Sequence, residues 1–224
     1  MDRIPATLAE VFPCWDQLDD EARGELGARV YSRSFCRGQV LHQGAGDCAG
    51  LFLVKRGQLR VYILSEGGKE VTLYRLFAWD ICLFSASCIM KNISFELHVE
   101  AEKDAEVFIV PAELFERLAK RSLPLADYQA QLLAARFSDV MWVMEQILFV
   151  SLDSRLAGFL LEQSAIERSD EINITHEEIA RHLGSAREVV TKMLHYLAGE
   201  GMVRLQRGRV TLVDRAKLEA LAPR

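Results

Sequence analysis

The chain has 224 residues, half of them hydrophobic and 26% charged, with a formal net charge of −5 at pH 7. A hydrophobic fraction of this size can bury a packed core in one large domain or two smaller ones, which excludes an intrinsically disordered protein. The negative net charge argues against a protein that coats nucleic acid without regard to sequence, because such binding depends on neutralising phosphates.

The start and the interior of the sequence predict neither export nor membrane insertion. The start lacks a basic stretch followed by an apolar run, and the most apolar part, residues 140–150, is interrupted by Glu145 and is too short to span a bilayer. The cysteines form an odd-numbered set, namely Cys14, Cys36, Cys48, Cys82 and Cys88. We therefore expect a cytoplasmic protein with reduced thiols and no membrane partner.

Short segments rich in β-branched and aromatic residues, separated by glycine turns, fill the stretch from about Arg33 to Ile109. They are residues 39–42, 51–54, 59–64, 71–76 and 107–110. Such close and regular spacing predicts an antiparallel β-roll of the jelly-roll kind. Pro111 follows the last segment and suits the first turn of a helix.

A long helix is predicted next, because residues 125–146 contain neither glycine nor proline. Apolar residues recur along it at alternating spacings of four and three, which gives a narrow seam of the coiled-coil type. The seam consists of Leu133, Phe137, Val140, Met144 and Ile147. A seam this narrow suits a partner helix and predicts a homodimer interface; the alternative is that the helix packs on its own β-roll.

Two sequences of the capping-box form lie ten residues apart in the last third of the chain. The first runs from Thr175 to Glu178 and the second from Ser185 to Glu188, each with a hydroxyl residue followed three positions later by glutamate. Gly184 stops the turn between them. Two short helices joined by a tight turn with glycine predict a helix-turn-helix, whose second helix enters the major groove of double-stranded DNA.

The second of these helices presents polar side chains outward. Arg187 and Glu188 lie in its first turn, where arginine can bind guanine O6 and N7 and glutamate can accept from cytosine N4. An acidic residue here repels phosphates, so its presence favours contacts with base edges over contacts with the DNA backbone. The further predicted DNA contacts on this element are Ser185, Thr191 and Lys192.

A two-stranded wing is predicted after the helix-turn-helix, because residues 203–212 alternate around a glycine turn. Arg207 and Arg209 are expected at its tip, where they could contact phosphates. Between Arg181 and Arg209, six basic residues stand against two acidic ones, so a positive patch lies within an acidic protein. The alternative is a helical hairpin with exposed charges, which the two capping boxes, the Arg-Glu pair and the basic wing together disfavour.

These segments resemble the CRP/FNR family of transcription regulators over nearly the whole chain. Residues 174–192 resemble the family's most specific motif, and Arg187, Glu188 and Lys192 fall where its members place their base-reading Arg, Glu and Arg. Lys192 departs from that pattern and lacks bidentate geometry. The glycines of the family's sensor β-roll are matched by Gly38, Gly44 and Gly57.

The resemblance implies an α+β fold and a regulator of transcription, either an activator or a repressor. It implies a homodimer that binds a near-palindromic DNA site, responds to a signal in the β-roll and has RNA polymerase as a partner. The expected parts are a β-roll sensor domain (1–124), a dimerisation helix with the hinge (125–150) and a winged helix-turn-helix domain (151–224).

The family's cyclic-nucleotide pocket holds phosphate with a Gly-Glu pair and an Arg-Ser or Arg-Thr pair. The corresponding stretches here are residues 79–88 and 94–101, and they lack the phosphate-gripping arginine. Phe95, Glu96 and Glu100 would oppose a nucleotide anion. Cyclic AMP is therefore not expected as the effector.

Other effectors remain open at this stage. Cys82 and Cys88 lie where the family's effector contacts lie, and they are either a thiol switch, ligands to a metal or iron-sulfur centre, or two small buried residues. Haem, ranked below the thiol switch, would use His42 or His98 as an axial ligand. The predicted sensor residues are thus Cys82, Cys88, Phe95, Glu96 and His98.

Two other classes of function compete with a regulator. A cupin-like, metal-dependent enzyme on the β-roll would need clustered His and carboxylate ligands, whereas the five histidines are scattered and three of them lie in the DNA-binding unit. A ligand-binding protein without DNA contact is disfavoured by the Arg-Glu pair and the basic wing. We therefore predict a regulator that is not an enzyme.

Overall fold

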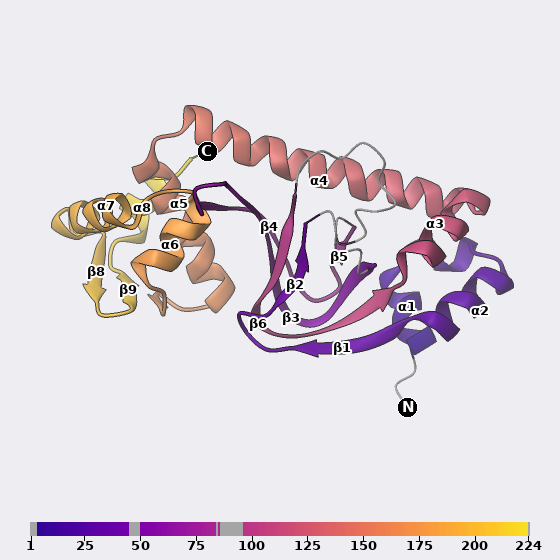
Figure 1. The fold of residues 1–224 in the computed structure, drawn as a ribbon. Coiled ribbons are helices and arrows are strands. Elements are labelled where there is room, and N and C mark those ends of the chain that lie inside the picture. The colour runs from indigo at the N-terminus through magenta and orange to yellow at the C-terminus, as the bar shows by residue number, and fades with distance from the viewer. Residues whose placement is uncertain (1–3, 45–49, 84, 86–95, 224) are drawn as a thin grey trace. The chain divides into compact units, whose positions relative to one another are not determined.

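The computed structural model describes residues 4–44, 50–83, 85 and 96–223 (Figure 1). The chain divides into two compact units, residues 1–64 with 73–140 and residues 65–72 with 141–224. Among the described residues, no helix combines the length and the apolar character that crossing a membrane requires.

The first unit begins with short helices and continues into a β-roll. The helices are α1 (Ile4–Val11), the 3-10 turn η1 (Trp15–Gln17) and α2 (Asp20–Arg29). The strands are β1 (Tyr31–Phe35), β2 (Val40–Gln43), β3 (Leu51–Leu64), β4 (Glu70–Leu76), β5 (Ile81–Cys82) and β6 (His98–Val110). Helix α3 (Ala112–Arg121) follows, and α4 (Leu123–Phe149) begins in this unit and ends in the second.

The predicted antiparallel roll is confirmed for the described strands. The sheet has the order β1-β6-β3-β4, with β2 also paired to β6 and β5 to β3. Strands β1, β2 and β3 run antiparallel to β6, and Leu53 lies opposite Phe108 on that ladder. Strands β6 and β3 are therefore the centre of the sheet, because each pairs with three other strands.

Glycine is required where β3 bulges against β6. Gly57 has φ +91°, and a Cβ atom there would lie 2.3 Å from the carbonyl oxygen of Asp104. The register shifts before, at and after this residue, between Val54 and Arg56, between Arg56 and Gln58, and between Gln58 and Leu59. The bulge lets a 14-residue strand bend with the roll.

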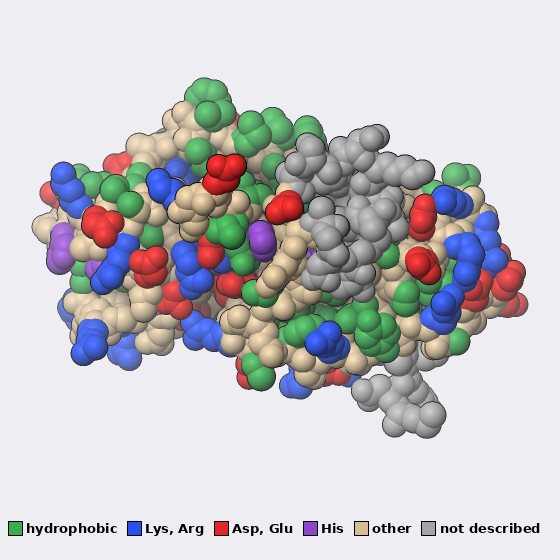
Figure 2. Space-filling model, viewed as in Figure 1, with side chains coloured by type: hydrophobic (Ala, Val, Ile, Leu, Met, Phe, Trp, Pro, Cys, Tyr) green, Lys and Arg blue, Asp and Glu red, His purple; other side chains and the backbone are tan. Residues whose placement is uncertain are grey.

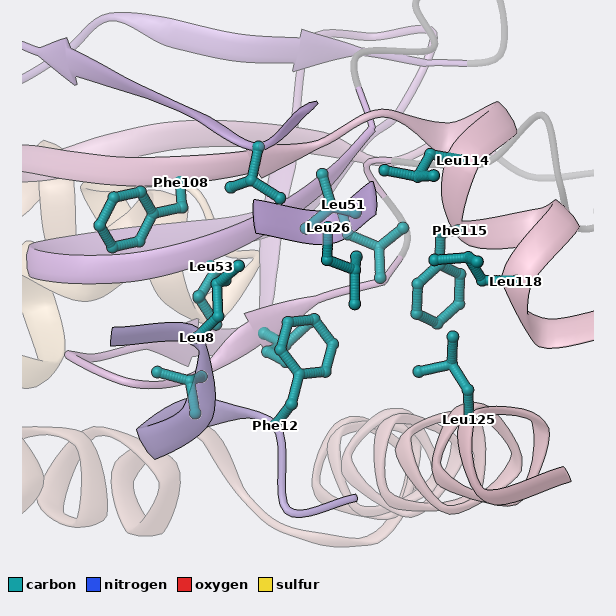
Figure 3. Packing of buried hydrophobic residues seen from close by; sticks show 14 of the residues in the cluster. Leu8, Phe12, Leu26, Leu51, Leu53, Phe108, Leu114, Phe115, Leu118 and Leu125 are labelled. Carbon is teal, nitrogen blue, oxygen red and sulfur yellow. The ribbon is translucent and has the colours of Figure 1, made fainter. Parts of the chain in front are cut away.

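A hydrophobic cluster joins the N-terminal helices, α3 and the start of α4 to one face of the roll (Figure 3). Side chains from separate elements converge in it, and all those labelled in Figure 3 are buried. They are Leu8, Phe12, Leu26, Leu51, Leu53, Phe108, Leu114, Phe115, Leu118 and Leu125. The spacing of Leu114, Phe115 and Leu118 gives α3 one apolar face, which explains why this segment forms a helix lying on the roll.

Helix α4 extends the predicted helix of residues 125–146 at both ends. Leu133, part of the predicted dimer seam, packs partly buried against the core of its own roll. Phe137, by contrast, is 66% exposed, and Met144 and Ile147 are also exposed. The seam is thus partly buried against the chain's own core at Leu133 and is exposed to solvent at Phe137, Met144 and Ile147.

The second unit contains the C-terminal helices and a small antiparallel sheet. Its elements are α5 (Leu152–Glu167), β7 (Glu171–Ile172), α6 (His176–Leu183), α7 (Arg187–Gly199), β8 (Val203–Gln206), β9 (Arg209–Leu212) and α8 (Arg215–Leu221). The strand order is β7-β9-β8. Leu160, Ile179, Leu194 and Leu218 are fully buried in its core, which joins α5, α6, α7 and α8.

Candidate nucleic-acid interface

The predicted capping box at the start of α6 is confirmed. The hydroxyl of Thr175 accepts a hydrogen bond from the Glu178 N–H at 3.1 Å, and the Glu178 carboxylate accepts one from the Thr175 N–H at 2.8 Å. Two N–H groups that the helix leaves without partners are thereby satisfied. The first helix of the helix-turn-helix therefore begins at a fixed residue.

The second predicted capping box is wrong, because the N-cap of α7 is Ala186 and not Ser185. The N–H of Ser185 donates to the carbonyl of Ala180 at 3.0 Å, so this residue completes the end of α6. Gly184 sits before it in the left-handed region, with φ +64°. Ser185 is therefore part of the turn. The first helical hydrogen bond of α7 runs from the N–H of Val190 to the carbonyl of Ala186.

Helix α7 has one buried side and one exposed side. Val190, Leu194 and Leu197 are fully buried, as their spacing predicts for a shared core. On the other side Arg187, Glu188, Val189, Lys192, His195 and Tyr196 are exposed. The predicted base-reading residues Arg187, Glu188 and Lys192 are therefore accessible from solvent.

Thr191 lies on the flank of α7 that faces α6. Its hydroxyl is 2.9 Å from Nδ1 of His176, a residue that the sequence analysis did not single out. Burial lowers the pKa of His176, and the positive charges of His195 and Arg187 lower it further. Sequence spacing gives little signal for this pair, because the two residues are 15 positions apart on different helices.

The wing is a two-residue hairpin, since Gln206 lies opposite Arg209 and Arg207-Gly208 form the turn. Arg207 is exposed at the tip, as predicted. Arg209 does not share that position: it begins β9, and its guanidinium donates to Glu171 at 3.0 Å and to Asn173 at 3.2 Å. The tip prediction therefore holds for Arg207 alone, because Arg209 belongs to the strand that pairs with β7.

Basic side chains gather over this unit. Figure 2 shows Lys and Arg side chains, with His among them, over the region of α7, β8 and β9 at the left of the view. Arg187, Lys192, Arg204 and Arg207 are all exposed. Because phosphates are the strongest charges on DNA, such a surface favours nucleic acid over an uncharged partner.

The predicted sensor residues lie in the first unit, apart from Cys88 and Phe95, which are outside the described residues. Glu96 is exposed, and the ring of His98 stacks on Tyr62 at a centroid distance of 5.2 Å. Cys82 is fully buried in β5. His42, the other proposed haem ligand, is also buried, with 1% of its surface exposed.

Cys82 belongs to a polar cluster between the roll and α4. Burial raises the pKa of Tyr74 well above its ordinary value, and the neighbouring Cys82 raises it further. The guanidinium of Arg136 on α4 lies 4.7 Å from the Tyr74 ring centroid and pairs with Asp139 at 2.8 Å. Across the described part of the chain, no three His, Cys, Asp or Glu side chains are placed to hold a metal ion together.

Comparison with known proteins agrees with this geometry. Residues 154–221 match the family description "Crp-like helix-turn-helix domain", and residues 32–122 match "cyclic nucleotide-binding domain". The Cyclic AMP receptor protein of Thermus thermophilus is 31% identical over 172 residues, covering 77% of this chain and 79% of that protein. Transcriptional regulator SdrP of the same organism is 30% identical over 201 residues, covering 84% and 93%.

A solved structure extends the likeness to nearly every residue. The crystal structure from Eubacterium rectale described as a CRP/FNR-family regulator is 51% identical, has a TM-score of 0.93, and covers 95% of this chain and 98% of its own. A β-roll followed by a long helix and a winged helix-turn-helix defines a DNA-binding transcription regulator. The chain belongs to the CRP/FNR family of these regulators.

Proposed function

We propose that the protein acts as a homodimer that reads a palindromic DNA site with α7 and responds to an effector in the β-roll. Its parts are the sensor domain (1–124), the dimerisation helix and hinge (125–150) and the DNA-binding domain (151–224). The observation that carries the proposal is the division of α7 into a buried side and a side with exposed Arg187, Glu188 and Lys192.

Base reading is assigned to the first turns of α7. Arg187 would bind guanine O6 and N7 with two hydrogen bonds, and Glu188 would accept from cytosine N4. Lys192 adds a single point charge one turn later. It therefore discriminates between bases less strongly than an arginine at the same position would. The supporting contacts are assigned to Ser185, Thr191, Arg207 and Arg209, with Arg207 best placed to reach a phosphate from the wing tip.

Dimerisation is assigned to the exposed apolar residues of α4. Phe137, Trp142 and Leu148 are 66%, 56% and 64% exposed, and Met141, Met144 and Ile147 are exposed with them. Val140 lies half-buried in the same stretch. So many exposed apolar side chains on one helix are rare on a monomer, and a second copy of α4 would cover those that share a face, namely Phe137, Met141, Met144 and Leu148. Two copies of α7 related by a two-fold axis would then read two half-sites about 34 Å apart.

The effector is assigned to the roll, either at Cys82 on β5 or at His98 on β6, and cyclic AMP is disfavoured because the sequence lacks the phosphate-binding arginine. The buried contact of Tyr74 with Arg136 supports a route from the roll to α4, since both residues lie in the first unit. Contact of the DNA-bound dimer with RNA polymerase is proposed from the family likeness alone.

Selection of bound duplexes from a random DNA library by the purified full chain tests this function. We expect an enriched palindrome with half-sites about one helical turn apart, bound by two copies of the chain. The mass of the complex is measured by light scattering on the enriched duplex. Enrichment of no sequence, or binding of a single copy to a non-palindromic site, would contradict the proposal.

A further inference from the structure

Val189 is an apolar residue on the otherwise polar outer side of α7. It is 44% exposed and stands between Glu188 and the fully buried Val190. Its N–H donates to the Ala186 carbonyl at 3.1 Å, so it lies in the first turn of the helix. Valine has a lower helix propensity than arginine, lysine, glutamine or glutamate, so neither helix formation nor core packing requires valine at this position.

The position of Val189 on the helix sets which part of DNA it can meet. Successive helical residues are about 100° apart, so Val189 and Thr191 lie on opposite flanks of the outer side. Thr191 faces His176 on α6, whereas Val189 shares its flank with Lys192 and the half-exposed Tyr196, three and seven residues later. Val189 therefore faces away from α6, next to Glu188 and Lys192, while Arg187 lies on the other flank with Thr191.

The major groove offers one apolar group to such a side chain. Base edges there are hydrogen-bond donors and acceptors, except for the C5-methyl group of thymine. From the exposure and position of Val189 we infer that its γ-methyl groups contact the 5-methyl of a thymine next to the base pair read by Glu188. This inference rests on the proposed function and adds a T·A preference that Arg187, Glu188 and Lys192 do not supply.

Replacing thymine by 2′-deoxyuridine isolates this contact, because uracil lacks only the methyl group and keeps the hydrogen-bonding edge. In the palindrome enriched by the full chain, each thymine of the half-site is replaced in turn, in both half-sites together. At one position the dissociation constant should rise about sixteenfold, since burial of one methyl group is worth about fourfold in each of the two half-sites. At the other thymines it should change little.

Two variants assign the effect to Val189. In Val189→Ala, the penalty for uracil should fall, because the γ-methyl groups that contact the thymine methyl are removed. Val213→Ala is the matched control: Val213 is 54% exposed and lies outside α7, so the preference for thymine should persist. Both side chains are exposed, and circular dichroism checks that both variants keep their helices.

The possible outcomes separate this inference from the function on which it rests. If an enriched palindrome has no thymine in its half-sites, tolerates uracil at every position, or keeps its uracil penalty in Val189→Ala, the inference is overturned while base reading by α7 stands. If no sequence is enriched at all, the proposed function fails and the inference fails with it.

Discussion

The imidazole Nδ1 of His176 on α6 lies 2.9 Å from the hydroxyl oxygen of Thr191 on α7. This contact joins the two helices of the helix-turn-helix on the flank away from Val189. His195 and Arg187 add positive charge near the same ring, and both lie on the exposed side of α7. The protonation state of His176 therefore affects the stability of the packing between α6 and α7.

Acidification should weaken the fold through His176. Its pKa is lowered in the folded protein, first by burial and then by His195 and Arg187, so the unfolded chain binds the proton more readily. The free energy of unfolding should fall as the pH drops from about 7 through the ordinary histidine pKa of about 6.5 and should level off below the lowered folded pKa. Urea unfolding of the wild type and His176→Gln at several pH values measures this. If the free energy of unfolding depended on pH identically in both proteins, the His176 imidazole would not be the source of that dependence.

Removing the cap of α6 should destabilise the DNA-binding unit. Thr175→Ala leaves the N–H of Glu178 without its partner, and we expect a loss of about 1 kcal/mol in the free energy of unfolding. Thr175→Ser keeps a hydroxyl at the same place and should recover most of it. Denaturant unfolding compares the three proteins. Equal losses in the alanine and serine variants would show that the threonine methyl group matters and the hydrogen bond does not.

A charge on the exposed part of α4 should separate the proposed dimer. Phe137→Glu places a carboxylate where a second copy of the helix would lie, and the 66% exposure of Phe137 means that the monomer fold should survive. Sedimentation equilibrium should give half the mass of the wild type. Glu145→Gln changes an exposed residue of the same helix and serves as the control. If the Phe137→Glu protein kept the wild-type mass, the dimer interface would not include this part of α4.

The thiols should differ in reactivity according to their burial. In a variant with Cys48 and Cys88 replaced by serine, Cys36 is exposed and should react at once with a thiol reagent. Cys14 and Cys82 are buried, and burial raises the pKa of the Cys14 thiol, so both should react only on unfolding. Rapid reaction of Cys82 in the folded protein would contradict its burial and would favour the thiol switch.

The sequence predicted best those features that depend on local spacing. The capping box of Thr175 and Glu178, the turn at Gly184 and the buried residues of α7 all follow from distances of a few residues along the chain. The strands of the roll could be predicted in the same way, because alternating and β-branched residues repeat within each segment of the sequence.

What the sequence could not specify depends on tertiary placement. Arg209 was expected at the wing tip, but β7 brings Glu171 and Asn173 within reach of its guanidinium. Ser185 has the residue type of an N-cap, yet its N–H completes α6 instead. The helical spacing of Leu133 is shared by Phe137, and only the folded roll shows that Leu133 meets the roll's core while Phe137 is exposed.

Reading of a base pair by Arg187 is the central element of the proposed function. Affinities of the wild type and Arg187→Ala are compared on the enriched palindrome, on duplexes changed at one base pair per half-site and on random DNA. We expect Arg187→Ala to lose about 1–3 kcal/mol at one base pair per half-site and to become indifferent to its identity, while binding to random DNA changes little. An equal loss on every duplex, random DNA included, would contradict base reading by α7.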